Sequence, residues 1–168
     1  RSSGVIANEF SEASVLFADI VNFTGIAARH APGDLILLIN EVFSHFDQLA
    51  ERHGAEKIKT IGDCYMAAAG VPQPRPDHAE ALANLALEMR EYVNSTTFVS
   101  GQKLSMRIGI HSGPLVAGII GRKKFQYDLW GETVNMASRL ESLGTAGQSR
   151  FLSRPMSASI VLLIAFQN

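Results

Sequence analysis

The sequence predicts an α+β fold, in which two long helices alternate with the strands of one antiparallel sheet. Apolar residues recur at helical spacing over two long segments, residues 32–53 and 77–94. The segments around them are short, rich in β-branched and aromatic residues, and broken by glycine, proline, asparagine or aspartate. Such runs are typical of strands and of the turns that join them.

The first of these runs, "SVLFADIVNFTG", begins as a buried strand over about residues 14–20 and turns within residues 22–25. Pro32 then opens an amphipathic helix, residues 32–53, and Gly54 ends it. The apolar residues of its inner face are Leu35, Leu38, Ile39, Val42, Phe43, Phe46 and Leu49.

A hairpin is predicted next, in "EKIKTIGDCYMAAAG", residues 56–70. An alternating run is interrupted at Gly62, and an apolar run resumes after Asp63, so these two residues form the turn. Asp63 is therefore expected at the hairpin tip and Lys59 on the incoming strand. In this geometry their side chains need not meet, and each can serve a different partner.

The second half of the chain repeats the pattern. A proline-rich loop precedes a helix over residues 77–94, and "LSMRIGIHSGPLVAGIIG" reads as a strand, a Ser-Gly-Pro turn and a second short strand. A further strand and a helix from Glu132 to Leu143 follow. The order β, α, β, β, α, β predicts a ferredoxin-like sheet with both long helices on one face.

Composition favours a single globular domain, residues 1–168, that acts on small molecules. Of the 168 residues 46% are hydrophobic, and the net charge of −1 argues against non-specific nucleic-acid binding. Cys64 is the single cysteine, which excludes an intrachain disulfide and fits a reducing, cytoplasmic location. With no signal peptide and no apolar run near the ~20 residues that span a bilayer, we expect membrane contact only through a longer parent chain.

Two aspartates mark the ends of the first strand and of the hairpin. We expect Asp19 and Asp63 to lie side by side at one sheet edge, where paired carboxylates suit two divalent cations. The pattern alone leaves equally open that both are ordinary turn residues. The turn at Asn22, Phe23 and Thr24 precedes a helix, so its backbone N–H groups could meet phosphate oxygens, although many such turns bind nothing.

Four blocks of the chain carry a family resemblance: "VLFADIVNFT", "EKIKTIGDCYMAAAG", "MRIGIHSGPLVAGIIG" and "YDLWGETVNMASRLES". In this order and spacing they resemble the catalytic domain of class III nucleotide cyclases, from about residue 15 to residue 147. Members of that family convert ATP or GTP to the 3′,5′-cyclic monophosphate and pyrophosphate with two metal ions.

The resemblance implies a role for each matching residue. Asp19 and Asp63 match the metal-binding aspartates and Ile20 a backbone carbonyl ligand, which implies two divalent cations, Mg²⁺ or Mn²⁺. Lys59 and Asp128 match the pair that reads the purine edge. Because an ammonium and a carboxylate complement N1 and N6 of adenine, and guanylyl members carry glutamate in place of Lys59, the implied substrate is ATP.

Asn135 and Arg139 lie four residues apart on a predicted helix, and that spacing alone favours a solvated polar stripe. By resemblance, Asn135 orients the ribose, Arg139 stabilises the transition state and Arg107 contacts the terminal phosphates. His111 matches no functional position of the family, so we expect it to pack at a strand end.

The family builds each active site from two domains packed head to tail. Because this chain carries both sets of residues, the resemblance implies a homodimer with two equivalent sites. Trp130 and Phe125 are expected in the core or in an interface. Residues 148–168 diverge from the family, and the stretch "SRFLSRPMSASIVLLIAFQN" lacks the lysine that members use to bind the triphosphate.

Three other functions are alternatives to an adenylyl cyclase. A cyclase-like regulatory domain that binds nucleotide with little turnover would lack a metal aspartate or Arg139, and a guanylyl cyclase would lack Lys59. An RNA-binding module would need exposed aromatic residues on its central strands, and "VLFADI" and "MRIGIH" do not have that pattern. We therefore expect an adenylyl cyclase without a nucleic-acid partner.

Overall fold

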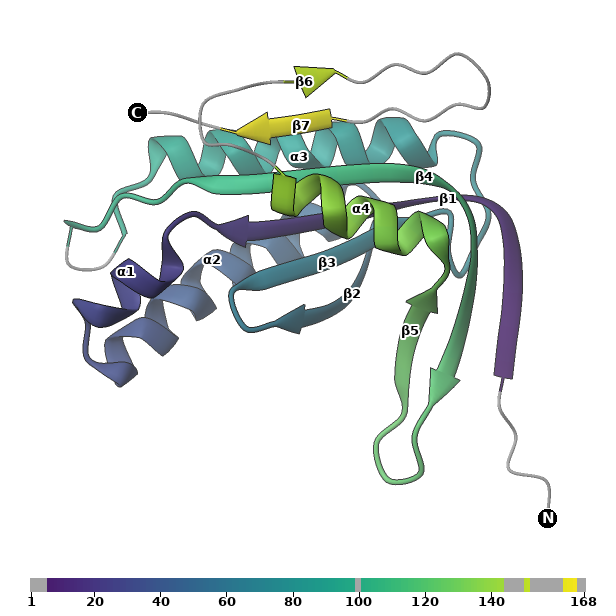
Figure 1. Ribbon diagram of the computed structural model, residues 1–168, viewed down its shortest axis with the longest axis horizontal. Helices are drawn as coiled ribbons and strands as arrows, with labels where there is room; N and C mark the ends of the chain where they lie inside the picture. Colours follow the sequence, from purple (N-terminus) through teal and green to yellow (C-terminus); the bar gives the residue numbers. More distant parts are fainter. Residues whose placement is uncertain (1–5, 99–100, 144–149, 152–161, 166–168) are drawn as a thin grey trace.

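The computed structural model describes residues 6–98, 101–143, 150–151 and 162–165 (Figure 1). Their elements are, in chain order, β1 (Ile6–Ile20), α1 (Phe23–Ala28), α2 (Pro32–Arg52), β2 (Glu56–Ile61), β3 (Cys64–Ala69), α3 (His78–Ser95), β4 (Met106–Ile120), β5 (Gln126–Trp130), α4 (Glu132–Leu143), β6 (Arg150–Phe151) and β7 (Leu162–Ala165).

The predicted ferredoxin-like core is confirmed. Four antiparallel strands lie in the order β2-β3-β1-β4, and β5 pairs with β4 outside this row. Alternation along β1 assigns its side chains to two faces, because successive residues of a strand point to opposite sides. Leu16 and Ala18 join the core under α2 and α3, whereas Val15 and Phe17 join the core under α4.

The three long helices therefore cover opposite faces of the sheet. Figure 1 shows α4 lying across one face of β1 and β4, with α2 and α3 on the other. Gly109 on β4 allows α4 to approach closely, because a Cβ atom at this position would collide with the backbone of α4 at Glu141 and Ala137. The close approach brings the inner side of α4 down onto the end of the sheet where β1 finishes.

Several predicted elements agree with the structure. The helix expected over residues 32–53 is α2, which ends one residue earlier, and Gly54 follows it with φ 65°. The helix expected over residues 77–94 is α3, shifted by one residue, and α4 has the predicted bounds. The hairpin turns at Gly62, whose φ of 59° suits glycine, and at Asp63.

Three predicted elements were wrong. The first strand begins at Ile6 and not near residue 14, and helix α1 occupies most of the turn expected over residues 22–25. The third error concerns β4, which is one continuous strand and not two strands joined by a turn. A β-bulge in β1 explains it, because the register steps from Phe10 opposite Leu115 to Ala13 opposite Gly113. Pro114 falls at this step, where its missing N–H removes no ladder hydrogen bond.

The described residues of the divergent tail add two strands to the sheet. Strand β7 pairs with β4, where Arg107 lies opposite Ala165, and β6 pairs with β7. The other residues of 148–168 lie outside the described part of the chain. Among the described helices, none has the length and apolar character needed to cross a membrane.

Candidate active site

The two aspartates predicted to lie together do so. Asp19 is the penultimate residue of β1 and lies opposite Cys64 of β3. Cys64 directly follows Asp63, which is in the hairpin turn. The pKa of Asp63 is raised, chiefly by burial and further by the negative charge of Asp19, while backbone hydrogen bonds from Asp63 itself and Ile20 oppose the shift. The end of β1 and the turn of the hairpin therefore bring two carboxylates close enough to repel each other.

Arg107 offsets part of this charge. It lies opposite Asp19 on β4, and its guanidinium donates two hydrogen bonds to that carboxylate, Nε to Oδ1 at 3.1 Å and Nη2 to Oδ2 at 3.0 Å. Such forked pairs are among the stronger ionic contacts in proteins. Their hydrogen bonds raise the pKa of Arg107 above its ordinary value, so the guanidinium stays charged.

A third carboxylate, Glu141, completes the cluster and was missed in the sequence. It projects from the inner side of α4, is 6% exposed, and places Oε1 3.5 Å from Nε of Arg107. Burial raises the pKa of Glu141 well above its usual range, and Asp19 raises it further. The available signal was a glutamate directly after Leu140 on a helix face that also buries Ala137.

Asp19 and Asp63 fit a hard divalent cation, because carboxylate oxygens are the ligands that Mg²⁺ and Mn²⁺ prefer. In the described residues, however, no group of three or more His, Cys, Asp or Glu side chains is arranged to hold a metal ion. Two carboxylates, the Ile20 carbonyl and oxygens from water or a bound phosphate would have to share the coordination, as is usual for Mg²⁺ at phosphate-binding sites.

Lys59 and Asp128 meet although 69 residues separate them in the chain. Nζ of Lys59 on β2 donates to Oδ2 of Asp128 on β5 at 2.7 Å. The backbone N–H of Leu129 donates to the other carboxylate oxygen at 2.8 Å, so the buried carboxylate of Asp128 is held in one orientation. The hairpin lysine thus has Asp128, and not Asp63, as its ionic partner.

Asn135 and Arg139 lie on the exposed side of α4, opposite to Glu141. Arg139 is 63% exposed in its side chain and is 3.4 Å from the equally exposed Glu132. Among the described residues, no hydrogen bond or ion pair joins Asn135 or Arg139 to Asp19 or Asp63. The structure therefore presents these two side chains to solvent, separate from the carboxylate cluster of their own chain.

The turn after β1 opens α1. Asn22 adopts a left-handed conformation with φ 56°, and the helix begins at Phe23. The side chain of Phe23 packs against the core under α2, whereas Asn22 and Thr24 are exposed. In this turn Phe23 would therefore meet a ligand through its backbone and not through its ring.

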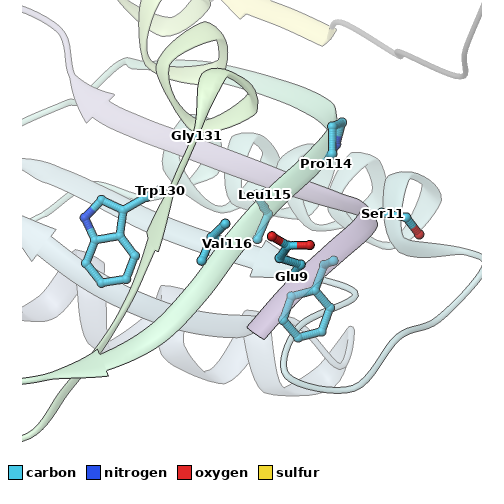
Figure 2. Close-up of a pocket in the computed structure, with 8 residues that line it drawn as sticks. Glu9, Ser11, Pro114, Leu115, Val116, Trp130 and Gly131 are labelled. Carbon is cyan, nitrogen blue, oxygen red and sulfur yellow. The ribbon is translucent and has the colours of Figure 1, made fainter. Parts of the chain in front are cut away.

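The structure corrects the expected positions of His111, Trp130 and Phe125. His111 lies within β4 opposite Val15, so its expected position at a strand end is wrong, and burial lowers its pKa. Trp130 and Phe125 are 41% and 78% exposed, which excludes the core. An open hollow of about 550 Å³ lies between β1, β4 and β5, and its lining includes Glu9, Val116 and Trp130. Figure 2 shows these side chains as sticks.

The comparisons with known proteins identify the family. The family described as the adenylate and guanylate cyclase catalytic domain matches residues 5–156. The chain belongs to this family. The matched range extends beyond residues 15–147, which carry the blocks seen in the sequence, at both ends.

Relatives of both nucleotide specificities are similar to the chain. An adenylate cyclase of Mycobacterium tuberculosis is 49% identical over 144 residues, 86% of this chain and 32% of the relative. The rat guanylate cyclase soluble subunit beta-2 is 44% identical over 83% of this chain and 21% of its own length. The solved catalytic core of a rhodopsin-guanylyl cyclase with converted specificity, in complex with ATPαS, has a TM-score of 0.82 at 32% identity and covers 95% of this chain and 98% of that one. The chain thus spans about a third or less of the full-length relatives.

Proposed function

We propose that this domain is an adenylyl cyclase that converts ATP to 3′,5′-cyclic AMP and pyrophosphate. The observation that carries the choice of ATP is the hydrogen bond between Lys59 and Asp128. An ammonium has three donors, so Lys59 can hold Asp128 and still donate to N1 of adenine. Asp128 can accept from the N6 amino group. Guanine presents the opposite pattern at both positions and would leave these groups unpaired, at a large cost in binding.

The carboxylate cluster supports the reaction chemistry. Asp19, Asp63 and the Ile20 carbonyl would hold two divalent cations, Mg²⁺ or Mn²⁺. When bound, such ions make the ribose 3′-hydroxyl more acidic and offset the charge on the triphosphate. Arg107 would contact the terminal phosphates.

The turn at Asn22, Phe23 and Thr24 would offer backbone N–H groups to the phosphates. The ribose 3′-oxygen would attack the α-phosphorus, giving up its proton and forming the new P–O bond, while the bond from the α-phosphorus to the bridging oxygen breaks and pyrophosphate leaves.

The position of Asn135 and Arg139 supports a site shared between two chains. Both face solvent on α4, away from Asp19 and Asp63 of the same chain. In a head-to-tail homodimer, Asn135 of one chain would orient the ribose and Arg139 would stabilise the transition state at the aspartates of the other. Such a dimer has two equivalent sites. We infer a cytoplasmic location, because ATP is the substrate, and membrane contact only through further parts of a longer chain.

Turnover on purified protein tests the function. We expect cyclic AMP from ATP with Mg²⁺ or Mn²⁺ and far less cyclic GMP from GTP. Product from GTP alone would favour a guanylyl cyclase. Nucleotide binding without product with either metal would favour a regulatory domain.

The purine-reading pair is tested by combining Lys59→Glu with Asp128→Ser. The ratio of ATP to GTP turnover is expected to fall at least about 10-fold, because both hydrogen-bond directions are reversed. Lys57→Glu is the matched control, since Lys57 lies on the same strand but pairs with Asp47. An unchanged ratio in the double variant would refute the assignment.

Mixing two inactive variants tests the shared site. One chain carries Asp19→Ala and the other carries Asn135→Ala with Arg139→Ala, so each homodimer has a defect in every site. A mixed dimer gathers all defects in one site and leaves the other intact. Random pairing makes about half of the dimers mixed, so activity should recover to roughly a quarter of wild type. No recovery from mixed dimers verified by co-purification would exclude the arrangement.

A further inference from the structure

Glu141 is a buried acid to which the proposed reaction gives no role. Its carboxylate faces Arg107 and Asp19, and within the described part of the chain no donor forms a hydrogen bond to its Oε1, which is shielded from solvent. The guanidinium of Arg107 instead directs Nε and Nη2 to Asp19. A buried carboxylate without a hydrogen bond on one oxygen is costly, so its position calls for an explanation.

The fold leaves Glu141 little freedom to withdraw. Its backbone is pressed against Gly109 of β4, where even a Cβ atom would not fit. Arg107 lies two residues before Gly109 on the same strand, and therefore on the same face of the sheet. The contact between α4 and β4 thus fixes this carboxylate beside the guanidinium.

Asp19 would have two cationic partners, Arg107 and the proposed divalent cation. In the structure both of its oxygens accept hydrogen bonds from Arg107. A divalent cation bound to Asp19 and Asp63 needs the same oxygens and repels the guanidinium. Arg107 must then give up hydrogen bonds to Asp19, and Glu141, 3.5 Å from its Nε, is already in place to accept one.

We propose that Glu141 is a positioning residue that takes over Arg107 from Asp19 when a divalent cation binds. This inference rests on the proposed function, because it assumes that Asp19 and Asp63 bind the cation. Glu141 then lowers the cost of freeing Asp19. It also keeps the guanidinium beside the site, where the triphosphate is expected.

Mn²⁺ binding to the nucleotide-free protein tests the proposal without a turnover assay. The variant Glu141→Gln keeps the size of the side chain but cannot carry the negative charge that would hold the guanidinium, so Arg107 should stay on Asp19. The dissociation constant for Mn²⁺, measured from the electron paramagnetic resonance signal of the free ion, should rise about 10-fold. Glu51→Gln on the exposed surface of α2 is the control and should leave this constant unchanged.

A double-mutant cycle separates an indirect role from a direct one. In an Arg107→Ala background no guanidinium competes for Asp19, so Glu141→Gln should change Mn²⁺ affinity by less than about 2-fold. An equal loss in both backgrounds would mean that Glu141 acts on the cation itself. No loss in the parent background would also overturn the proposal.

Two further variants make every outcome decisive. Asp63→Ala should abolish Mn²⁺ binding; if it does not, the metal site itself is wrong and the inference fails with it. If Asp63→Ala abolishes binding, a failure of the cycle counts against Glu141 alone. Should Glu141→Gln not fold, judged by circular dichroism, Glu141→Asp provides the same cycle, because it withdraws the charge from Arg107 by one methylene.

Discussion

The two faces of the sheet are built on different principles. Under α2 and α3 most buried side chains are apolar and include the ring cluster of Phe43, Phe46 and Tyr65. The polar exceptions Ser14, Ser112 and His78 are uncharged or titratable groups joined by hydrogen bonds through the Ser14 hydroxyl. The ion pairs of Arg52 and His53 with Glu88 lie at the outer side of these helices.

Under α4 the apolar cluster is smaller, and the end of the sheet carries three carboxylates, Asp19, Asp63 and Glu141, around the guanidinium of Arg107. Burial and mutual repulsion make such a cluster unfavourable for folding. The face under α2 and α3 therefore contributes most of the stability, while the face under α4 carries charges that can bind a cation or a phosphate.

The largest expected effect is the loss of turnover in Asp63→Asn. Turnover should fall at least about 1,000-fold, equivalent to about 4 kcal/mol of transition-state stabilisation by the metals. The melting temperature in the presence of EDTA should nevertheless rise, because the substitution removes a charge that burial and Asp19 disfavour. A lower melting temperature would show that the α4 face also contributes stability through this charge.

Phe46→Ala tests the opposite face. Phe46 is fully buried and contacts the rings of Phe43, Tyr65 and Tyr92, so its truncation should lower the free energy of unfolding by about 3–5 kcal/mol. Urea unfolding measures this loss, and turnover per folded molecule should stay near that of wild type. Ile36→Ala, on the exposed side of α2, should change stability by less than about 0.5 kcal/mol.

The two faces should also differ in their response to pH. The folded-state pKa values of Asp63 and Glu141 lie above the ordinary 3.8 and 4.5, so the protonated forms favour folding. The protonated forms contribute fully to the free energy of unfolding below the ordinary pKa values of 3.8 and 4.5. This contribution is lost as the pH rises through the raised folded-state pKa of each group. In EDTA, Glu141→Gln should weaken the decline in melting temperature between pH 5 and pH 7.5. An identical decline in the variant would contradict the electrostatic account of the α4 face.

The smallest effect is expected for Glu88→Gln on the helical face. His53 and Arg52 lower the pKa of Glu88, so this contact stabilises the fold above pH 4.5 and is lost as the pH falls through the folded-state value. Because the carboxylate is largely exposed, its removal at pH 7 should cost only about 0.3–1 kcal/mol, and less at high salt. Urea titrations at two salt concentrations measure the difference. A loss of stability equal to that of Phe46→Ala would show that this ion pair contributes as much to stability as the apolar core, which contradicts the account given for this face.

Local signals account for the parts of the fold that could be predicted. The periods of α2 and α3, the stop at Gly54 and the turn at Gly62 are all properties of neighbouring residues. The continuity of β4 depends instead on a bulge in its partner β1, which no pattern around Pro114 reveals.

The same division holds for the site. The sheet order made the meeting of Asp19 and Asp63 predictable. Resemblance alone suggested that Lys59 and Asp128 form a pair, because their separation in the chain carries no local signal. Glu141 acquires its significance from the contact between α4 and Gly109, which is a property of tertiary packing.

Helix α4 has a further consequence in the proposed dimer. This helix carries Arg139 and Glu141, which are two residues apart. Glu141 faces the carboxylates of its own chain, whereas Arg139 faces solvent, where the other chain's active site would form. A helix moves as a stiff rod, so any shift of α4 that accompanies a change in the contact between Glu141 and Arg107 also displaces Arg139. In the proposed dimer, cation binding at the aspartates of one subunit would then change the position of the arginine that this subunit contributes to the other site. The two sites would be thermodynamically linked through one helix, and ligand binding at either would alter affinity at both.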